Sequence, residues 1–119
     1  MTDNIYWTLK VAIGDGKLDD FKSLAGEMSE ATKKDEPGAL AYEWHLSPDG
    51  KSCHIHERYA DNAAVMTHLG NFGSKFAGRF MELVKPVSLD VYGPADTTVR
   101  GALADFGAQH LDQFSGFSR

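Results

Sequence analysis

The sequence predicts an α+β domain whose strands and helices follow one another in the order βαββαβ. Four segments alternate large apolar with smaller or polar residues, as strands with one buried face do. Two longer segments between them repeat apolar residues three and four positions apart, as one face of a helix does. With 119 residues, 42% of them hydrophobic, the chain has the size and composition of one domain with a core of its own.

The first half of the chain contributes a strand, a helix and a hairpin. Residues 5–13, IYWTLKVAI, are predicted as the first strand, which GDG ends. Residues 17–34 carry apolar side chains at helical spacing, and DEPG follows them as a stop. ALAYEWHL (39–46) and KSCHIHERY (51–59) flank SPDG and are predicted to form a hairpin.

The second half completes the unit. Asp61 can cap a helix that runs through Leu83, with a kink expected at Gly70. The fourth strand is predicted over PVSLDVYG (86–93), with Pro86 at its first position, where a missing N–H is tolerated. This order is that of the ferredoxin-like fold, with its antiparallel sheet covered on one face by two helices.

The last residues are expected as an appendage, 96–119, to the main domain, 1–95. Asp96 or Thr97 can cap a short helix that Gly107 stops. We expect the tail after it to be an ordered coil. Its apolar residues recur every third position and could dock the tail; they are Leu111, Phe114 and Phe117.

The hairpin holds three of the five histidines, and its register decides which face of the sheet each occupies. With Asp49 and Gly50 as a two-residue type I′ turn, one face of the hairpin is nearly all apolar and is expected beneath the helices. A three-residue loop that includes Pro48 would mix core and charged side chains on one face. With the two-residue turn, the pairs on the inner face are Leu46 with Cys53, Trp44 with Ile55, Tyr42 with Glu57 and Leu40 with Tyr59. The fourth strand adds Val87, Leu89 and Val91 to this face.

Glu57 is the one carboxylate expected on the inner face, and His68 shares a helix face with apolar residues. A buried carboxylate has to be paired or protonated, because an unpaired charge is costly to desolvate. Two interpretations stay open: Glu57 and His68 are satisfied core residues, or they are catalytic residues of a pocket that orients or deprotonates a phenolic ligand. The expected substrate-binding walls of that pocket are Tyr42, Trp44, Tyr59, Val65 and Phe72.

The outer face is expected to be polar. His45 opposite His54 and Glu43 opposite His56 bring imidazoles and a carboxylate within reach, and such a set can ligate zinc, copper or iron. We expect no metal there, because the face is flat with no evident cavity, and favour a dimer interface over a metal site or plain solvent exposure. The expected interface residues are Glu43, His45, His54, His56 and Arg58.

Charge and composition exclude other partners. The formal net charge is -5 with scattered lysines and arginines, which disfavours nucleic acid and anionic membrane surfaces. The single cysteine excludes an intrachain disulfide, and the polar start MTDN shows no signal segment, so we expect a cytoplasmic protein. No stretch approaches the roughly 20 apolar residues of a membrane span.

Three segments resemble the antibiotic biosynthesis monooxygenase family: VAIGDGKLDDF (11–21), EPGALAYEW (36–44) and ERYADNAAVMTHL (57–69). The resemblance extends from residue 5 to about residue 93. It implies a homodimer that pairs sheet to sheet as a dimeric α+β barrel, and it implies that Glu57 and His68 are pocket residues. The family includes cofactor-independent oxygenases of quinols and polyketide phenols, haem-degrading enzymes and proteins without known activity.

The sequence also departs from the pattern of one branch of this family. The haem-degrading branch has an aromatic residue, usually tryptophan, at the position of Tyr59, and a histidine haem ligand about where Phe76 falls, so haem is not expected. We therefore expect a monooxygenase without cofactors that acts on a quinol or other electron-rich phenol, whose deprotonated form can itself pass an electron to O₂. The alternatives are a non-catalytic dimer that binds a small aromatic ligand, and a metal-binding dimer that uses His45, His54 and His56.

Overall fold

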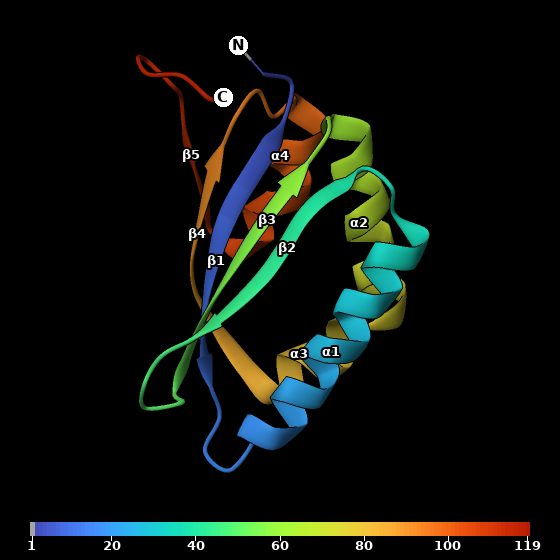
Figure 1. Cartoon of the computed structure of the whole chain (residues 1–119), viewed down its shortest axis with the longest axis vertical. Coiled ribbons are helices and arrows are strands. Elements are labelled where there is room, and N and C mark those ends of the chain that lie inside the picture. Colours follow the sequence, from blue (N-terminus) through green and yellow to red (C-terminus); the bar gives the residue numbers. More distant parts are fainter. Residues whose placement is uncertain (1) are drawn as a thin grey trace.

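A five-stranded sheet of order β2-β3-β1-β4-β5 is the frame of the computed structural model, which describes residues 2–119 (Figure 1). The elements are β1 (Ile5–Ile13), α1 (Leu18–Asp35), β2 (Ala39–Leu46), β3 (Ser52–Tyr59), α2 (Asn62–Lys75), α3 (Ala77–Leu83), β4 (Val84–Tyr92), α4 (Thr97–Leu103), a 3₁₀ turn (Ala104–Phe106) and β5 (Ala108–Leu111). The strands β1 to β4 pair antiparallel, in the order of the ferredoxin-like fold. The predicted fold is therefore confirmed.

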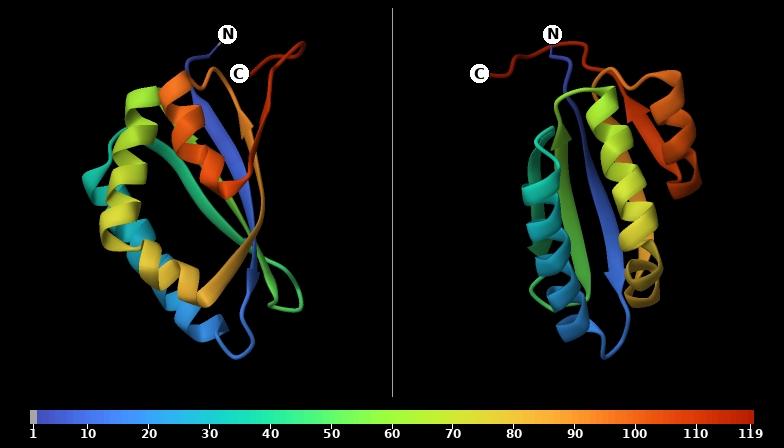
Figure 2. Two further views of the ribbon diagram at one scale, coloured as in Figure 1. Left: turned by 180° about the vertical axis from the view of Figure 1, so that it is seen from behind. Right: turned by 90° about the vertical axis from the view of Figure 1, so that its right-hand side faces the viewer.

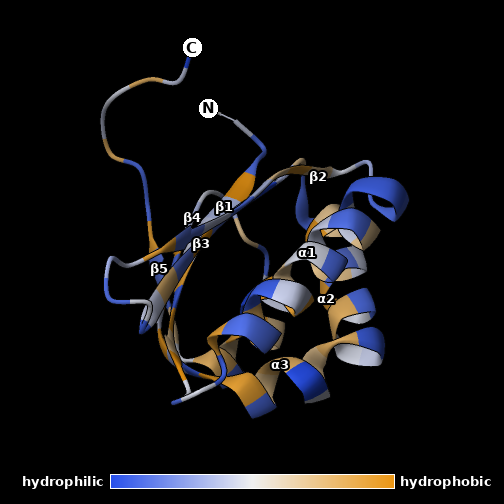
Figure 3. Ribbon diagram, turned by 60° about the horizontal axis from the view of Figure 1, so that its bottom comes forward, coloured by the Kyte–Doolittle hydropathy of each residue, from blue (hydrophilic) through white to orange (hydrophobic). Residues whose placement is uncertain are grey.

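The helices cover one face of the sheet and leave the other face open. Figure 2 shows α1, α2 and α3 on the same side of the strands, with α4 beside α2, and Figure 3 shows the two layers edge-on. Every second residue of β1 is buried, from Ile5 to Ile13, and α1 buries Phe21, Leu24 and Met28 in the same core. Each such side chain contributes roughly 2 kcal/mol through burial. Among the described residues, no helix has the length and apolar composition that a membrane crossing requires.

From Tyr42 to Leu46 the hairpin has the predicted register, but its turn differs from the predicted one. Leu46 pairs with Cys53 and Trp44 with Ile55, as expected. The type I′ turn is wrong, because it needs positive φ at both central residues, and here only Gly50 has it, at 73°. The Gly50 N–H instead donates to the Ser47 carbonyl over 3.0 Å, in a turn for which the fixed φ of Pro48 is suited.

Two residues that were predicted to face inward lie at β-bulges and are exposed instead. The register of β2 on β3 shifts between Ala39 and Ala41, so that Ala39 faces Tyr59 and Leu40 is 53% exposed. The register of β1 on β4 shifts next to Val87, which is 68% exposed. A bulge inserts one unpaired residue, and a period-two pattern cannot reveal where that happens.

The second helix breaks later than expected. α2 passes through Gly70 without interruption and ends at Lys75, and Phe76 separates it from α3. The kink expected at Gly70 is therefore wrong. β4 begins at Val84, two residues before Pro86.

In the C-terminal segment the predicted short helix is present, but part of the predicted coil is a strand. The Asp96 carboxylate accepts a 2.8 Å hydrogen bond from the Val99 N–H and caps α4, and Gly107 follows the 3₁₀ turn with φ 70°. Of the residues expected as coil, Ala108–Leu111 form β5, parallel to β4, because the edge of β4 offers unpaired backbone groups, and residues 112–119 form no helix or strand. The sheet is thus not purely antiparallel. Phe114 and Phe117, expected to dock the tail, are 98% and 78% exposed.

Candidate functional site

The structure brings Glu57 and His68 together beneath the helices. Alternation along β3 turns Glu57 inward, and helical spacing along α2 places His68 over it; both are buried. The His68 Nε2 atom lies 3.3 Å from the Glu57 Oε1 atom. The buried polar pair expected from the sequence is therefore present.

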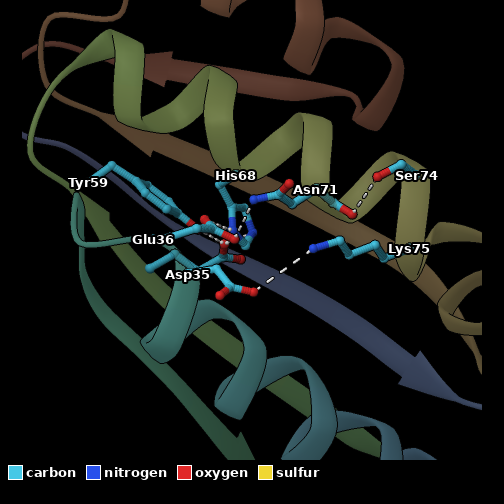
Figure 4. A network of polar contacts seen from close by, with 8 residues as sticks. Asp35, Glu36, Tyr59, His68, Asn71, Ser74 and Lys75 are labelled. Carbon is cyan, nitrogen blue, oxygen red and sulfur yellow. Dashed lines mark hydrogen bonds and ion pairs between the residues drawn. The ribbon is translucent and has the colours of Figure 1, made fainter.

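A second carboxylate, Glu36, was missed by the sequence analysis. Glu36 follows the last residue of α1 and is 6% exposed. Its Oε1 atom lies 2.9 Å from His68 Nδ1, and its Oε2 atom accepts a 3.3 Å hydrogen bond from the Asn71 side chain (Figure 4). His68 is thus held between two buried carboxylates, one at each ring nitrogen.

This arrangement fixes the charge of His68. Burial alone would lower the pKa of the imidazole, but hydrogen bonds and charge attraction from Glu36 and Glu57 outweigh it and raise the pKa to about 9. Burial likewise works against the Glu36 carboxylate, yet its hydrogen bond with His68 holds its pKa below the usual value. At neutral pH the side chain of His68 is an imidazolium that donates from both nitrogens.

Two phenols complete the site. The Tyr59 hydroxyl donates a 2.5 Å hydrogen bond to Glu57 Oε1, the same oxygen that faces His68. Among the described residues, no hydrogen bond reaches Glu57 Oε2. Burial, and then the negative charge of Glu57, raises the pKa of both Tyr42 and Tyr59 well above the usual value, so both phenols stay neutral. The Tyr42 ring contacts His68 edge-on, with ring centroids 5.3 Å apart.

A cavity of about 40 Å³ lies between this cluster and the helices. Its lining comes from the sheet, the helices and the C-terminal 3₁₀ turn: Trp7, Leu9, Met28, Tyr42, Ile55, Glu57, His68, Leu69, Phe72, Phe80, Leu89, Leu103 and Phe106. This volume suits a few water molecules. An aromatic ligand therefore needs side chains to move, and the half-buried rings of Phe72 and Phe106, with centroids 6.4 Å apart, lie where α2 meets the 3₁₀ turn.

The expected pocket walls divide into two groups. Tyr42 and Phe72 line the cavity, whereas Trp44, Tyr59 and Val65 do not. Trp44 packs edge-on against Phe21, with ring centroids 5.7 Å apart, and its buried Nε1 atom has no hydrogen-bond partner within residues 2–119. Tyr59 acts on the site through its hydrogen bond to Glu57.

The open face holds the expected histidines away from this cavity. The rings of His45 and His56 are 5.1 Å apart, and the His56 Nδ1 atom lies 2.9 Å from the Thr8 hydroxyl. The Arg58 guanidinium stacks 4.0 Å from the centre of the Tyr6 ring. Within residues 2–119, no group of three or more histidine, cysteine or acidic side chains is arranged to hold a metal ion.

The open face is not flat, contrary to expectation. A hollow of about 390 Å³ lies on it. Its lining residues are Tyr6, Trp7, Thr8, Ala41, Glu43, His56, Glu57, Arg58 and Tyr92. The side chains of β1, β2, β3 and β4 thus surround a concave surface rather than a plane.

The model of the antibiotic biosynthesis monooxygenase family matches residues 5–75, which include both Glu36 and the Glu57 and His68 pair. The chain belongs to this family. A sequence comparison with curated proteins gives no match. The segment that the family model matches ends at Lys75, the last residue of α2.

Solved structures extend the likeness to the whole chain. MupZ from Pseudomonas fluorescens is 29% identical with a TM-score of 0.88, over 100% of this chain and 91% of its own, so the match includes α4 and β5. SnoaB from Streptomyces nogalater, a cofactor-independent oxygenase, is 15% identical with a TM-score of 0.67, over 81% of this chain and 97% of its own. Rv0793 from Mycobacterium tuberculosis is 23% identical with a TM-score of 0.67, over 78% and 96%. The last two share the fold.

Phe76 lies about where the haem-degrading branch of the family has its histidine haem ligand. It separates α2 from α3, is half-buried against the core, and its side chain has no atom that could ligate iron. The residue at this position therefore does not fit a haem ligand.

Proposed function

We propose that this member of the antibiotic biosynthesis monooxygenase family is a cofactor-independent monooxygenase of a small electron-rich phenol, such as a quinol. The observation that carries the proposal is the buried pair of Glu57 and His68 at the wall of a small, mostly apolar cavity. The family match and the fold shared with SnoaB support it. A non-catalytic dimer that binds the same ligand is the alternative, because fold alone does not specify activity.

The pair has complementary tasks in such a reaction. Glu57, whose Oε2 atom has no partner among the described residues, accepts the phenolic proton. His68, as an imidazolium, stabilises the phenolate that forms, and the low dielectric of the site strengthens this attraction. This assigns the role of base to Glu57 alone, where the sequence left it open between Glu57 and His68.

The phenolate then supplies the electrons. It passes one electron to O₂, and the phenoxyl radical and superoxide combine at a ring carbon that carries hydrogen. The peroxide takes a proton from His68, and the hydroperoxide loses water as the ring C–H is converted to C=O. One oxygen atom enters the ring and the other leaves as water, so a quinol gives a hydroxyquinone and no external reductant is needed.

Oxygen labelling tests this function. Purified protein is incubated with a panel of small hydroquinones under ¹⁸O₂, and the product is analysed by mass spectrometry. We expect one labelled oxygen in the ring and one molecule of O₂ consumed per product. Autoxidation instead gives an unlabelled quinone and hydrogen peroxide. Ligand-induced stabilisation without any oxygen uptake above the protein-free rate would decide for the non-catalytic alternative.

We also propose that two copies pair through the open face. This face mixes aromatic, aliphatic and charged groups, as suits a surface that packs on its own symmetry mate. A homodimer has about twice the 13.0 kDa chain mass, which sedimentation at micromolar concentration measures. A monomer would contradict both the dimer and the barrel.

The dimer is expected to depend on the polar side chains of the open face. The charged groups on this face are Lys10, Glu43, Arg58 and Asp90. Replacing His45, His54 and His56 together by alanine removes imidazole rings that would pack against the partner copy, and we expect the dissociation constant, measured by sedimentation, to rise by about tenfold. An unchanged dissociation constant in this variant, or bound metal lost on replacing His54 and His56, would contradict this interface.

A further inference from the structure

The cavity beside Glu57 crosses the sheet, and its two sides differ in chemistry. Tyr42 and Glu57 lie on β2 and β3, where His68 faces them from α2. Leu89 lies on β4, which β1 separates from β3, so these two strands are about 10 Å apart. The titratable groups of the lining are therefore gathered at one side, and the other side is apolar.

The C-terminal segment forms the far side of the cavity. Leu103, the last residue of α4, and Phe106, in the 3₁₀ turn, line it, and both lie beyond the segment 5–75 that the family model matches. The Asn62 side chain, at the start of α2, donates a 3.2 Å hydrogen bond to the Pro94 carbonyl and accepts a 2.8 Å hydrogen bond from the Asp96 N–H. After Phe106 the chain continues into β5, which pairs with β4. Hydrogen bonds thus fix this wall at both ends.

Phe106 is the part of this wall that a ligand can displace. Leu103 is 1% exposed, whereas Phe106 is half-buried. The other half-buried apolar residues of the lining are Leu69 and Phe72, on the helix that carries His68. The Phe72 ring packs against two other rings, those of Phe80 and Phe106, with centroids 5.4 and 6.4 Å away. Within residues 2–119, the Phe106 ring packs against the Phe72 ring alone, so a longer ligand displaces Phe106 first.

We propose that Phe106 determines the specificity of the site: it limits the length of the apolar group that a phenolic ligand carries away from its reacting hydroxyl. The inference rests on the proposed function, which places that hydroxyl at Glu57. The body of the ligand then crosses β1 past Leu9 toward Leu89 and Phe106, whose side chains offer no hydrogen bond. A charged end there would be desolvated without a partner, which is costly. The site therefore takes phenols whose far end is apolar.

The length limit is tested by calorimetric titration with 4-propylphenol and 4-hexylphenol. We expect the wild type to bind the shorter phenol more tightly, and Phe106→Ala to reverse this order, with a gain of about tenfold for 4-hexylphenol from the additional buried methylene groups. Phe106→Leu, which preserves more of the packing, should show the same change in smaller measure. The matched control is Phe114→Ala, the same change at a side chain that is 98% exposed. An unchanged order in both Phe106 variants would overturn the inference.

The apolar far side is tested in the wild type, without any variant. The ligand 3-(4-hydroxyphenyl)propanoate places a carboxylate at the end of a chain like that of 4-propylphenol, and tyramine places an ammonium group there. We expect both to bind on the order of 100-fold more weakly than 4-propylphenol. Because the two charges are opposite, weak binding of both is not explained by repulsion from Glu57. Binding of either as tight as that of 4-propylphenol would overturn the inference.

A third measurement does not depend on phenol binding. An apolar cavity left by truncation of a side chain stays dry and binds xenon. Crystals of Phe106→Ala under xenon pressure should therefore show xenon beside Leu103 and Phe72, and those of the wild type should show none there. Xenon at this place, with no phenol bound by any variant, would refute the proposed function and still support Phe106 as the wall. A variant without xenon there would overturn the place of Phe106 in the cavity.

Discussion

Glu57→Gln is expected to lower the rate of the first oxygenation turnover by about 10² to 10⁴-fold, the usual effect of removing a general base. The amide can still accept from the Tyr59 hydroxyl, so the fold and the cavity are expected to persist. Stopped-flow mixing with an excess of enzyme over quinol measures the rate.

The matched control for Glu57→Gln is Glu30→Gln, which makes the same chemical change on the exposed side of α1. It should leave the rate unchanged. A Glu57→Gln protein that still incorporates label from ¹⁸O₂ at the wild-type rate would remove Glu57 from the mechanism.

The second large effect is on the pH dependence of stability. The pKa of His68 is raised from 6.5 to about 9 in the folded protein. The stabilisation of the fold that protonated His68 contributes is therefore fully present below pH 6.5 and is lost as the pH rises through 9. At about 1.4 kcal/mol for each pH unit, the wild-type free energy of unfolding should fall by about 3 kcal/mol over this range.

Denaturant titrations at several pH values measure this fall, and His68→Gln provides the comparison. The variant is less stable at pH 6.5, because two buried carboxylates lose their counter-ion, and it should lack the fall near pH 9 that belongs to the His68 imidazolium. Burial also raises the pKa of the Cys53 thiol. This shift affects the stability of both proteins at the upper end of the pH range, so it cancels when the free energy of unfolding of the variant is subtracted from that of the wild type. Parallel curves for wild type and variant would show that His68 is not the titrating group.

Glu57 and His68 could be predicted because each lies in a regular element. Period-two alternation with Ile55 and Tyr59 turns Glu57 inward, and helical spacing from Val65 places His68 on the same buried side. Their contact then follows from the topology, which puts α2 over β3.

Glu36 has no such pattern. It precedes Pro37 in the segment between α1 and β2, where side-chain direction depends on how the chain packs rather than on a period. Gly38 allows this packing, because a Cβ atom there would lie 2.6 Å from the Cβ of Ala64 on α2. The close approach of this segment to α2 is a tertiary contact, and the sequence contains no local signal for it.

The strand β5 shows the same limit. Four residues are too few to establish a period, and their pairing depends on the unpaired edge that β4 presents. The bulges at Leu40 and Val87 are similar, since each is defined by its partner strand. Local patterns therefore predicted the elements and most of their faces, while edges and irregular segments depended on contacts between elements.

The central place of β1 in the sheet also constrains the order in which the chain can fold. β1 leaves the ribosome first, yet its two neighbours, β3 and β4, are synthesised much later. The hairpin of β2 and β3 closes the shortest loop and can form early, and β1 can then pair with β3. Until β4 is complete at Tyr92, one edge of β1 remains open to pairing with other chains. Expression yield should therefore be sensitive to changes that slow the pairing of β4, even where they leave the final stability unchanged.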